Sequence, residues 1–307
     1  MYDVIGVGAN SVDLVYRLPE YPHVAKLPMA DHEVFFGGQV TTALTTCVAM
    51  GLRAAYIGTF GSDSRATGMR QELARLGIDT THAVVRQAAN PCAVVVLANP
   101  NGERIVLWRR DPEVALRPSD VDGDAIRSAR LLHVDDVDRE ASIEAATVAR
   151  ERRLPVTSDI ERTDAGALDM VEAVTVPIFA QHVPAALTGE AEPARALKAL
   201  RRPQHTMLCV TLGARGAMLV EGDTVHVAPG LPLTTVDTTG AGDVFRGAFI
   251  CAMLRGDAPR DILRFANAAA ALSCTKVGAM ASVPTAEDTE ALLLEQHEPE
   301  RRDRQRE

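Results

Sequence analysis

The most informative stretch of the sequence reads Val236-Asp237-Thr238-Thr239-Gly240-Ala241-Gly242-Asp243-Val244-Phe245-Arg246-Gly247-Ala248. The small residues at 240–242 let the backbone approach a ligand closely, and the apolar pattern that follows predicts a helix over 244–255. The free amides and the dipole at the start of a helix favour anionic oxygen. The stretch therefore predicts an anion-binding turn at 240–242.

An acidic residue, Asp243, falls in the first turn of this predicted helix, beside the anion site. A carboxylate there repels a bound phosphate, but it can accept the proton of an alcohol that attacks phosphorus. Such a base next to donors that stabilise developing charge is the arrangement of phosphoryl transfer. A helix cap is the other interpretation, since Asp is common in first turns.

The composition indicates a globular protein with a large aliphatic core. Of 307 residues, 47% are hydrophobic, 24% are charged and only 4% are aromatic. The formal net charge of −9 argues against a nucleic-acid partner. Five widely spaced cysteines predict free thiols in a reducing compartment. No leader and no apolar run of membrane-spanning length is present, so we expect a cytoplasmic protein without a membrane partner.

Short β-branched runs alternate with Ala- and Leu-rich stretches along most of the chain. Strands are expected at 4–8, 54–58, 131–134, 155–160, 206–212 and 216–221, and helices at 41–50, 66–76, 140–152, 244–255 and 262–275. This alternation indicates crossover units in a mainly parallel sheet with helices on both faces. The expected fold is a three-layer α/β/α sandwich.

Two segments interrupt the alternation. One covers about 13–36 and is rich in proline, and the other, 92–111, has two β-rich runs around Asn101-Gly102, a strong hairpin signal. We expect them to form a small β-sheet, the lid, that stands off the main body. Residues 1–294 then form one domain, and the charged tail 295–307, which has no apolar face, is expected to be frayed or disordered.

The run from Asp237 to Asp243, followed by Gly247-Ala248, resembles the C-terminal motif of the ribokinase-like, or phosphofructokinase B, carbohydrate kinases. In that family the last Asp of the motif is the catalytic base, which implies this role for Asp243. The family's anion hole corresponds to the amides of Gly240, Ala241 and Gly242. The resemblance implies an enzyme that uses ATP and Mg²⁺ to phosphorylate a hydroxyl of a small sugar or sugar-like alcohol.

The resemblance extends over nearly the whole chain. On the sugar side, segment 8–13 matches the family's opening turn, whose Asp binds substrate hydroxyls, and Gly37-Gly38 matches the glycine pair under the sugar. The lid matches the family's lid, which often makes a dimer contact, so we expect a homodimer. The implied substrate-binding residues are Asn10, Asp13, Gly37, Gly38, Thr42, Arg104 and Asp135.

On the nucleotide side, segment 211–216 resembles the family's T-x-G-x-x-G loop, and segments near 267 and 273–275 fall where the family lines its adenine pocket. The implied nucleotide-binding residues are Thr211, Gly213, Gly216, Asn267 and Cys274. Some members of the family hold a monovalent cation such as K⁺ nearby. The residues that correspond to that site are Asp237, Thr239, Gly278 and Ser282.

Three positions depart from the family pattern. Thr42 stands where the family usually has an Asn that touches the substrate. The N-x-x-E motif that often precedes the Leu-Thr-Gly run is absent before Leu187-Thr188-Gly189. Arg246 replaces a common Asn just after the base, where it can reach the substrate or phosphate or be paired on the helix surface.

The substrate itself stays open. The lid and the missing Asn look more like the ketohexokinase and sulfosugar kinase branches than like ribokinase. Arg104, Arg109 and Arg110 can grip an anionic group through paired bonds, or they are solvated lid charges. The acidic pair Asp135-Asp136 favours a neutral polyol, with Asp135 on a hydroxyl and with Asp136 and Asp138 as surface charges.

Three other functions fit the sequence less well. A dinucleotide oxidoreductase would need G-x-G-x-x-G after the first strand, but position 11 is Ser. A nucleoside kinase of the same fold would need an aromatic residue that stacks on the base. Trp108 and Phe36 are candidates, although each is more simply lid core. A catalytically silent sugar-binding homologue would have no need of an acid such as Asp243 beside an anion hole.

Overall fold

The fold is built on a central sheet in two four-stranded halves. This computed structural model describes residues 1–18, 26, 28–29, 31–97 and 104–304, without the side chains of Arg104 and 297–304. One half has the order β10-β9-β1-β4 and is parallel throughout. Its strands are β1 (Tyr2–Val7), β4 (Ala54–Ile57), β9 (Ala129–Asp135) and β10 (Val156–Asp159).

The other half of the sheet has the order β11-β12-β13-β14. Its strands are β11 (Ile178–Phe179), β12 (Leu208–Thr211), β13 (Ala217–Glu221) and β14 (Thr224–Ala228). The β11–β12 pair is parallel, whereas β12–β13 and β13–β14 are antiparallel hairpin pairs. Single bridges from Thr157 to Val176 and from Ile160 to Phe179 join the two halves. The mainly parallel sheet is therefore confirmed, with an antiparallel edge.

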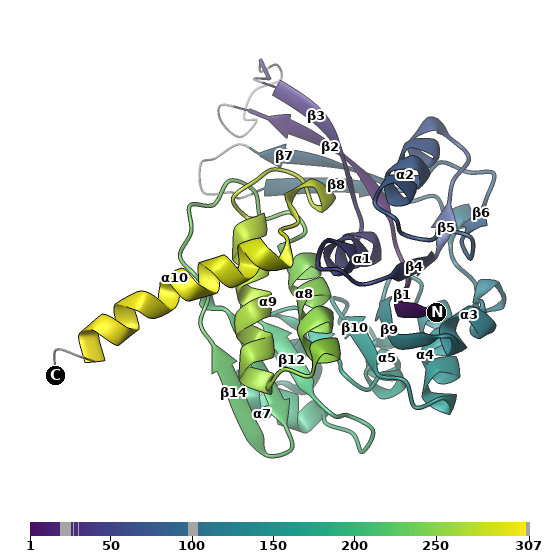
Figure 1. Ribbon diagram of the computed structural model, residues 1–307. Coiled ribbons are helices and arrows are strands. Elements are labelled where there is room, and N and C mark those ends of the chain that lie inside the picture. Colours follow the sequence, from purple (N-terminus) through teal and green to yellow (C-terminus); the bar gives the residue numbers. More distant parts are fainter. Residues whose placement is uncertain (19–25, 27, 30, 98–103, 305–307) are drawn as a thin grey trace.

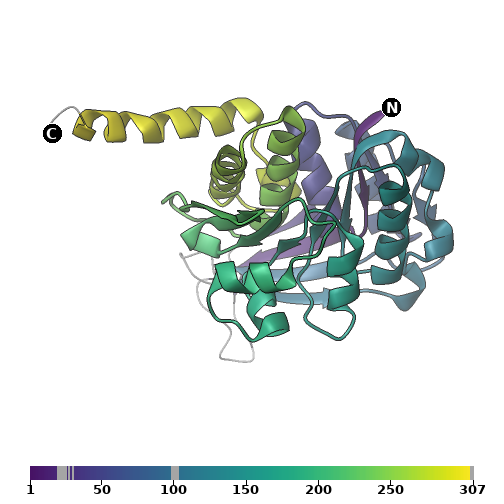
Figure 2. The same cartoon turned by 90° about the horizontal axis from the view of Figure 1, so that it is seen from below.

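Helices cover both faces of this sheet, as Figure 2 shows from below. The helices on one face are α1 (Gln39–Ala49), α2 (Ser64–Arg75), α8 (Ala241–Arg255) and α9 (Pro259–Ser273). Those on the other face are α3 (Gly123–Arg127), α4 (Arg139–Glu151), α5 (Ala167–Ala173), α6 (Val183–Thr188) and α7 (Pro193–Leu200). Successive β1 residues, Val4 and Ile5, belong to the two different apolar clusters. The strands are thus apolar on both faces, as a covered parallel sheet requires.

The two segments that interrupt the alternation contribute to one lid sheet, of order β3-β2-β7-β8. Its strands are β2 (Ser11–Arg17), β3 (Asp31–Gly37), β7 (Cys92–Leu97) and β8 (Arg104–Arg109). Figure 1 shows this sheet standing off the main body beside α1. Its inner face buries Val15, Ala93, Val95 and Leu97. A separate short parallel pair consists of β5 (Thr59–Phe60) and β6 (Val84–Val85).

The edge of the lid sheet, strand β8, differs from expectation. Trp108 is 75% exposed, so the interpretation of this residue as lid core is wrong. Leu107 and Val34 are also exposed on the lid strands. Leu107 and Trp108 are consecutive on β8 and therefore point to opposite faces, and Trp108 pairs with Ala93 on the inner face. Both are exposed because β8 is the edge strand of the sheet. The predicted hairpin tip at Asn101-Gly102 lies outside the described residues.

The C-terminal segment ends in α10 (Ala286–Arg304), which extends away from the body in Figure 1. Thr289 and Leu292 are buried near its start. The helical backbone continues across most of 295–307, where the sequence predicts a frayed or disordered tail. Glu, Gln and Arg favour helix, so a helix that is anchored at its start can continue into this charged segment.

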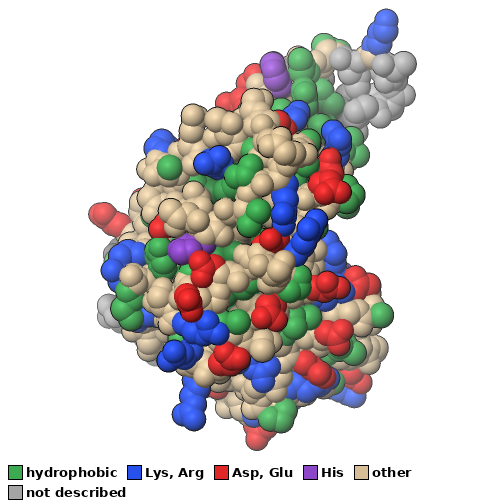
Figure 3. Space-filling view, turned by 90° about the vertical axis from the view of Figure 1, so that its right-hand side faces the viewer, with side chains coloured by type: hydrophobic (Ala, Val, Ile, Leu, Met, Phe, Trp, Pro, Cys, Tyr) green, Lys and Arg blue, Asp and Glu red, His purple; other side chains and the backbone are tan. Residues whose placement is uncertain are grey.

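Some charged side chains at and near the surface are paired with opposite charges. Figure 3 shows basic and acidic side chains interspersed over one face of the molecule. An example is Arg86, whose Nη2 lies 2.6 Å from Asp120 Oδ2. All five cysteines are free thiols, as expected. Within the described residues, no helix combines the length and the apolar character that a membrane crossing needs.

Candidate active site

The predicted anion-binding turn lies at the N-terminus of α8. Gly240 is the N-cap, with a left-handed φ of 77°. A Cβ added at Gly240 would lie 2.6 Å from the Cβ of Ala279, so only glycine fits. The helix begins at Ala241, three residues before the predicted start, because this glycine turn leads directly into it. The Ala241 amide donates to the Thr238 carbonyl oxygen at 3.3 Å. Amides in the first turn of a helix lack intrahelical acceptors, which favours an anion at this end of α8.

The carboxyl group of Asp243 lies in this first turn and is partly buried. Burial is the main reason that its pKa is raised to about 8, and Glu161 and Asp135 raise it further. Arg246 acts in the opposite direction and lowers this pKa. A general base works best when its pKa lies near the working pH. A carboxyl with a raised pKa beside an anion-binding turn can act as a general base, and this role of Asp243 stays a prediction.

A pocket of about 630 Å³ opens on one side of the turn. The α8 residues Ala241, Gly242 and Phe245 line its inner end. The five residues assigned to the nucleotide by resemblance also line it: Thr211, Gly213, Gly216, Asn267 and Cys274. The Nδ2 of Asn267 donates to the carbonyl oxygens of Ala228 and Pro229, at 2.9 and 3.1 Å. Asn267 thus shapes the pocket by holding the end of β14.

The volume and lining of this pocket fit ATP. A volume of several hundred Å³, mostly apolar walls and a few polar groups are typical of small-molecule sites. The pocket ends at the α8 N-terminus, where amides and the helix dipole favour a phosphate group. The residues present would therefore hold a nucleotide with its phosphates toward Gly240–Gly242.

The predicted sugar side meets the turn through Ala279. A Cβ added at Gly37 would lie 2.6 Å from Asp13 Oδ2 and 3.5 Å from Ala279 Cβ. Ala279 also packs closely against Gly240. Asp13 is buried, and its Oδ1 accepts a hydrogen bond from Ser11 Oγ at 2.7 Å. Asp13, Gly37 and the anion turn thus form one continuous region.

Asn10 is buried among protein partners. Its Nδ2 donates to Tyr56 Oη and to the Thr59 carbonyl, and its Oδ1 accepts from Asn90 Nδ2. Gly38 has a φ of 103° and packs directly on the Asn10 backbone. These contacts hold the turn between β1 and β2 against the start of α1. A contact of Asn10 with the substrate stays a prediction.

Asp135, at the end of β9, is also fully buried. Its Oδ2 accepts from the Ala9 amide at 2.7 Å and its Oδ1 from the Val137 amide at 3.0 Å. Burial raises the pKa of this carboxyl to about 7 in spite of these bonds. The structure favours a role in holding the 8–10 turn, and the assignment of Asp135 to a substrate hydroxyl stays a prediction.

The expectation that Asp136 and Asp138 are surface charges is wrong. Asp136 is 1% exposed and accepts hydrogen bonds from the amides of Glu161 and Arg162. Asp138 Oδ2 lies 2.5 Å from Arg110 Nη2. These acids are occupied within the protein, so the acidic run no longer argues for a neutral sugar.

Of two further residues assigned to the substrate, Thr42 and Arg104, the structure describes the side chain of Thr42 only. Thr42 is fully buried, its methyl group lies under Gly240, and its hydroxyl has no hydrogen-bond partner in the described part of the chain. It therefore supports the anion turn from below. The side chain of Arg104 lies outside the described residues. Arg109 is exposed on β8.

The residues assigned to a monovalent cation lie in two segments, 237–239 and 278–282. The carboxylate of Asp237 joins these segments. Asp237 Oδ1 accepts from the Thr239 amide at 2.8 Å, and its Oδ2 accepts from the Gly278 amide at 3.0 Å. Ser282 is buried, and its Oγ donates to the Ala279 carbonyl. The loop from Gly278 to Ser282 is thereby tied to the segment before the anion turn.

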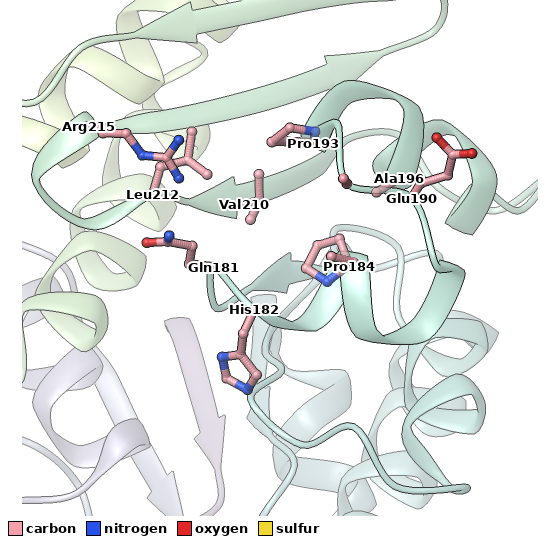
Figure 4. A pocket seen from close by; sticks show the side chains of 11 residues that line it. Gln181, His182, Pro184, Glu190, Pro193, Ala196, Val210, Leu212 and Arg215 are labelled. Atoms are coloured by element: carbon pink, nitrogen blue, oxygen red, sulfur yellow. The ribbon is translucent and has the colours of Figure 1, made fainter.

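A second pocket, of about 510 Å³, lies on the other side of the 211–216 loop. Figure 4 shows that Gln181, His182 and Arg215 contribute to its wall. Residues 180–183 are the place where N-x-x-E is missing, and Gln181 points toward the loop that also forms the nucleotide pocket. No part of the proposed chemistry uses this second pocket.

The sequence did not reveal one buried ion pair under the site. Arg246, expected on the helix surface or at the substrate, is 1% exposed, and its Nη2 lies 2.5 Å from Asp159 Oδ1 at the end of β10. The neighbours of Arg246 on α8 include Phe245 and Phe249, an apolar context that signals burial. The identity of the partner depends on how α8 crosses the sheet, which no local pattern contains.

Comparisons with known proteins agree with this geometry. A model of the family described as pfkB family carbohydrate kinase matches residues 3–286. Probable fructokinase-4 of Arabidopsis thaliana is 28% identical over 320 residues, which cover 94% of this chain and 96% of the relative. Ribokinase of Haemophilus influenzae is 26% identical over 294 residues, which cover 92% and 95%. A crystal structure of a "putative ribokinase" from Agrobacterium tumefaciens has a TM-score of 0.90 and 29% identity, with coverage of 97% and 99%.

Proposed function

The chain belongs to the pfkB family of carbohydrate kinases, and from this premise we propose that Asp243 is the base that activates a sugar hydroxyl for attack on ATP. One observation carries the proposal. Asp243 directly follows Gly242, which lines the nucleotide pocket, and the turn before it meets the Asp13–Gly37 region at Ala279. A hydroxyl bound near Asp13 can thus face both the base and the phosphate end of the pocket.

Each group of residues has a separate role in the phosphoryl transfer. Asp243 accepts the proton as the hydroxyl oxygen bonds to the γ-phosphorus, while the bond from that phosphorus to the β,γ-bridging oxygen breaks and ADP leaves. The amides of Gly240–Gly242 stabilise the charge on the transferred group. Mg²⁺ bound with ATP would supply further charge neutralisation. The lid sheet covers the sugar side and would exclude water from the site.

The acceptor is tested by ADP release from ATP and Mg²⁺ over a panel of ketoses, pentoses, sugar acids and nucleosides. A response to one ketose or pentose supports the proposal and begins to explain Thr42. A response to nucleosides alone would replace it with a nucleoside kinase. Silence of a folded protein that binds ATP would contradict the proposal for every acceptor class on the panel.

Replacing Asp13 by Ala is expected to raise the KM for the best sugar roughly 10- to 100-fold, because a hydrogen bond to a charged group contributes about 1.5–3 kcal/mol. The KM for ATP should stay the same, since Asp13 does not line the nucleotide pocket. Asp31→Ala is the matched control, because it removes an exposed carboxylate of the same lid sheet. An unchanged sugar KM would remove Asp13 from the site.

We also propose K⁺ as an activator, supported by the tie between Asp237 and the loop at Gly278. A cation bound there would order this loop, whose Ala279 contacts both Gly240 and Gly37. The expected result is a higher kcat in K⁺ than in Na⁺ at equal ionic strength. Equal rates in the two salts would exclude selective activation.

The five free thiols support a reducing, cytoplasmic location.

A homodimer through the lid is a further part of the proposal, supported by Val34 and Leu107, which are exposed on the same face of the lid sheet. Exposed apolar patches of this kind mark association surfaces. Light scattering after gel filtration is expected to give twice the chain mass, and Leu107→Glu to shift it to the monomer. Val227→Glu, on exposed β14, is the control. A monomeric wild type would contradict the dimer.

A further inference from the structure

The side chain of Arg246 is the largest fully buried side chain of the described residues. It projects from α8 under the anion turn: a Cβ added at Gly242 would lie 2.8 Å from Arg246 Nη1. Its Nη2 lies 2.5 Å from Asp159 Oδ1, and both side chains are almost inaccessible to solvent. A buried cation next to a catalytic carboxylate needs an explanation, because burying a charge is costly unless it is paired.

The charged and titratable groups around Asp243 come from three elements. They are Arg246 on α8, Asp159 and Glu161 at and after the end of β10, and Asp135 on β9. Arg246 also faces His133 on β9 and Cys209 on β12. Burial lowers the pKa of His133 to about 3 and raises the pKa of the Cys209 thiol. These two groups are therefore neutral, and Arg246 is the cation of a cluster that is otherwise acidic.

We propose that Asp159 is a counter-ion that holds the Arg246 guanidinium away from Asp243, so that the base has a positive charge beneath it without being locked in a salt bridge. Asp159 and Arg246 are then positioning residues for the reaction. This inference rests on the proposed role of Asp243.

The physical reason lies in two opposite demands on the base. Burial and the nearby carboxyls of Glu161 and Asp135 raise the pKa of Asp243, and without a nearby cation they would favour its protonated form. With a cation in direct contact, the carboxylate would be a weak base and would turn away from the substrate. A guanidinium fixed on Asp159 meets both demands, because the guanidinium fork is rigid and always charged.

The two partners therefore have opposite expected effects on the titration of Asp243. In Arg246→Met the midpoint should move to higher pH by about 1–3 units, the usual effect of one adjacent opposite charge. In Asp159→Asn it should move to lower pH, because the freed guanidinium then pairs with Asp243. The sign follows from the charge: losing a cation favours the protonated carboxyl, and gaining one favours the carboxylate.

The measurement is carbon NMR of the labelled Asp carboxyl groups in the full chain, with the Asp243 signal assigned from its loss in Asp243→Asn. It needs no substrate. A pH profile of kcat for the best sugar should follow the same midpoints, with the KM for ATP little changed. Arg246→Lys keeps the charge and should titrate closer to wild type than Arg246→Met does.

Two further variants are controls for misfolding and for indirect effects on the titration of Asp243. Single replacements leave a buried charge unpaired, whereas the double variant Arg246→Met/Asp159→Asn leaves none and is expected to fold better than Arg246→Met. Its shift should be smaller than that of Arg246→Met. Arg86→Met breaks a 2.6 Å pair with Asp120 outside the site and should leave the midpoint unchanged.

The outcomes separate this inference from the proposed function. If Asp243→Asn abolishes turnover but Asp243 titrates in Arg246→Met and Asp159→Asn as in wild type, the counter-ion role is wrong and the base stands. If both shifts have the same sign, the counter-ion role is also wrong. If Asp243→Asn keeps its turnover, the proposed base is wrong, whatever the titration shows.

Discussion

Asp243→Asn is expected to lower kcat by about 10²–10⁴-fold, the usual contribution of a positioned general base. The amide has almost the same shape as the carboxyl, so the anion turn and the start of α8 should keep their structure. It cannot take up the proton of the attacking hydroxyl. The KM for the sugar should change little. ADP release at saturating ATP and sugar measures the effect.

The matched control for Asp243→Asn is Asp63→Asn. Asp63 is the N-cap of α2 and accepts a hydrogen bond from the Ala66 amide. Asn is about as good an N-cap as Asp, so this change should cost little stability and no turnover. If Asp243 is only a helix cap, the two variants should behave alike. Wild-type turnover in a folded Asp243→Asn protein would disprove the proposed mechanism.

Gly240→Ala is expected to have the next largest effect, a loss of roughly 10²–10³-fold in kcat, as when one oxyanion donor is removed. A Cβ at this position would lie 2.6 Å from Ala279 Cβ and 2.9 Å from Ala279 Cα, so the backbone has to move. The left-handed φ adds about 1–2 kcal/mol of strain for a residue with a Cβ. Movement of the turn displaces the amides from the transferred phosphoryl group.

Gly256→Ala separates the strain from the displacement. Gly256 ends the same helix with a similar φ of 86°, but no atom of the described residues lies within 4 Å of an added Cβ. Its thermal stability should fall, because the left-handed strain is the same, while kcat should stay at the wild-type value. Thermal unfolding and kcat are measured on both variants. Equal kcat values for the two variants would show that the position of the turn does not matter.

The residues that the sequence assigns to the nucleotide side line one pocket, and their contact with a nucleotide stays a prediction. The segments on this side are recognisable in the sequence because each one is local. The glycines of the turn, Asp243 and the 211–216 loop are each part of a short run whose backbone conformation depends on its own residues. The alternation of strands and helices predicts a parallel sheet. That sheet brings these separate runs together at one pocket. The fold class is confirmed for the same reason.

The parts that the sequence does not predict depend on contacts between distant segments. Asp136 resembles a surface acid at a strand end, yet it accepts the amides of residues 161 and 162 from the neighbouring strand end. Arg246 is recognisable as unusual in an apolar helix, but its partner Asp159 lies on β10. Trp108 pairs with Ala93 on the inner face of the lid sheet, yet it is exposed because β8 is the edge strand, and the order of the strands depends on pairings between distant segments.

The central claim is that the protein moves the γ-phosphoryl group of ATP onto a sugar hydroxyl. Phosphorus NMR of the reaction mixture, with the best acceptor of the panel, tests this claim most directly. The expected result is a new phosphate-ester signal that grows in step with ADP. It should be absent without the sugar and strongly reduced in Asp243→Asn. ADP that forms together with free inorganic phosphate, and without an ester signal, would contradict the claim and indicate hydrolysis of ATP instead.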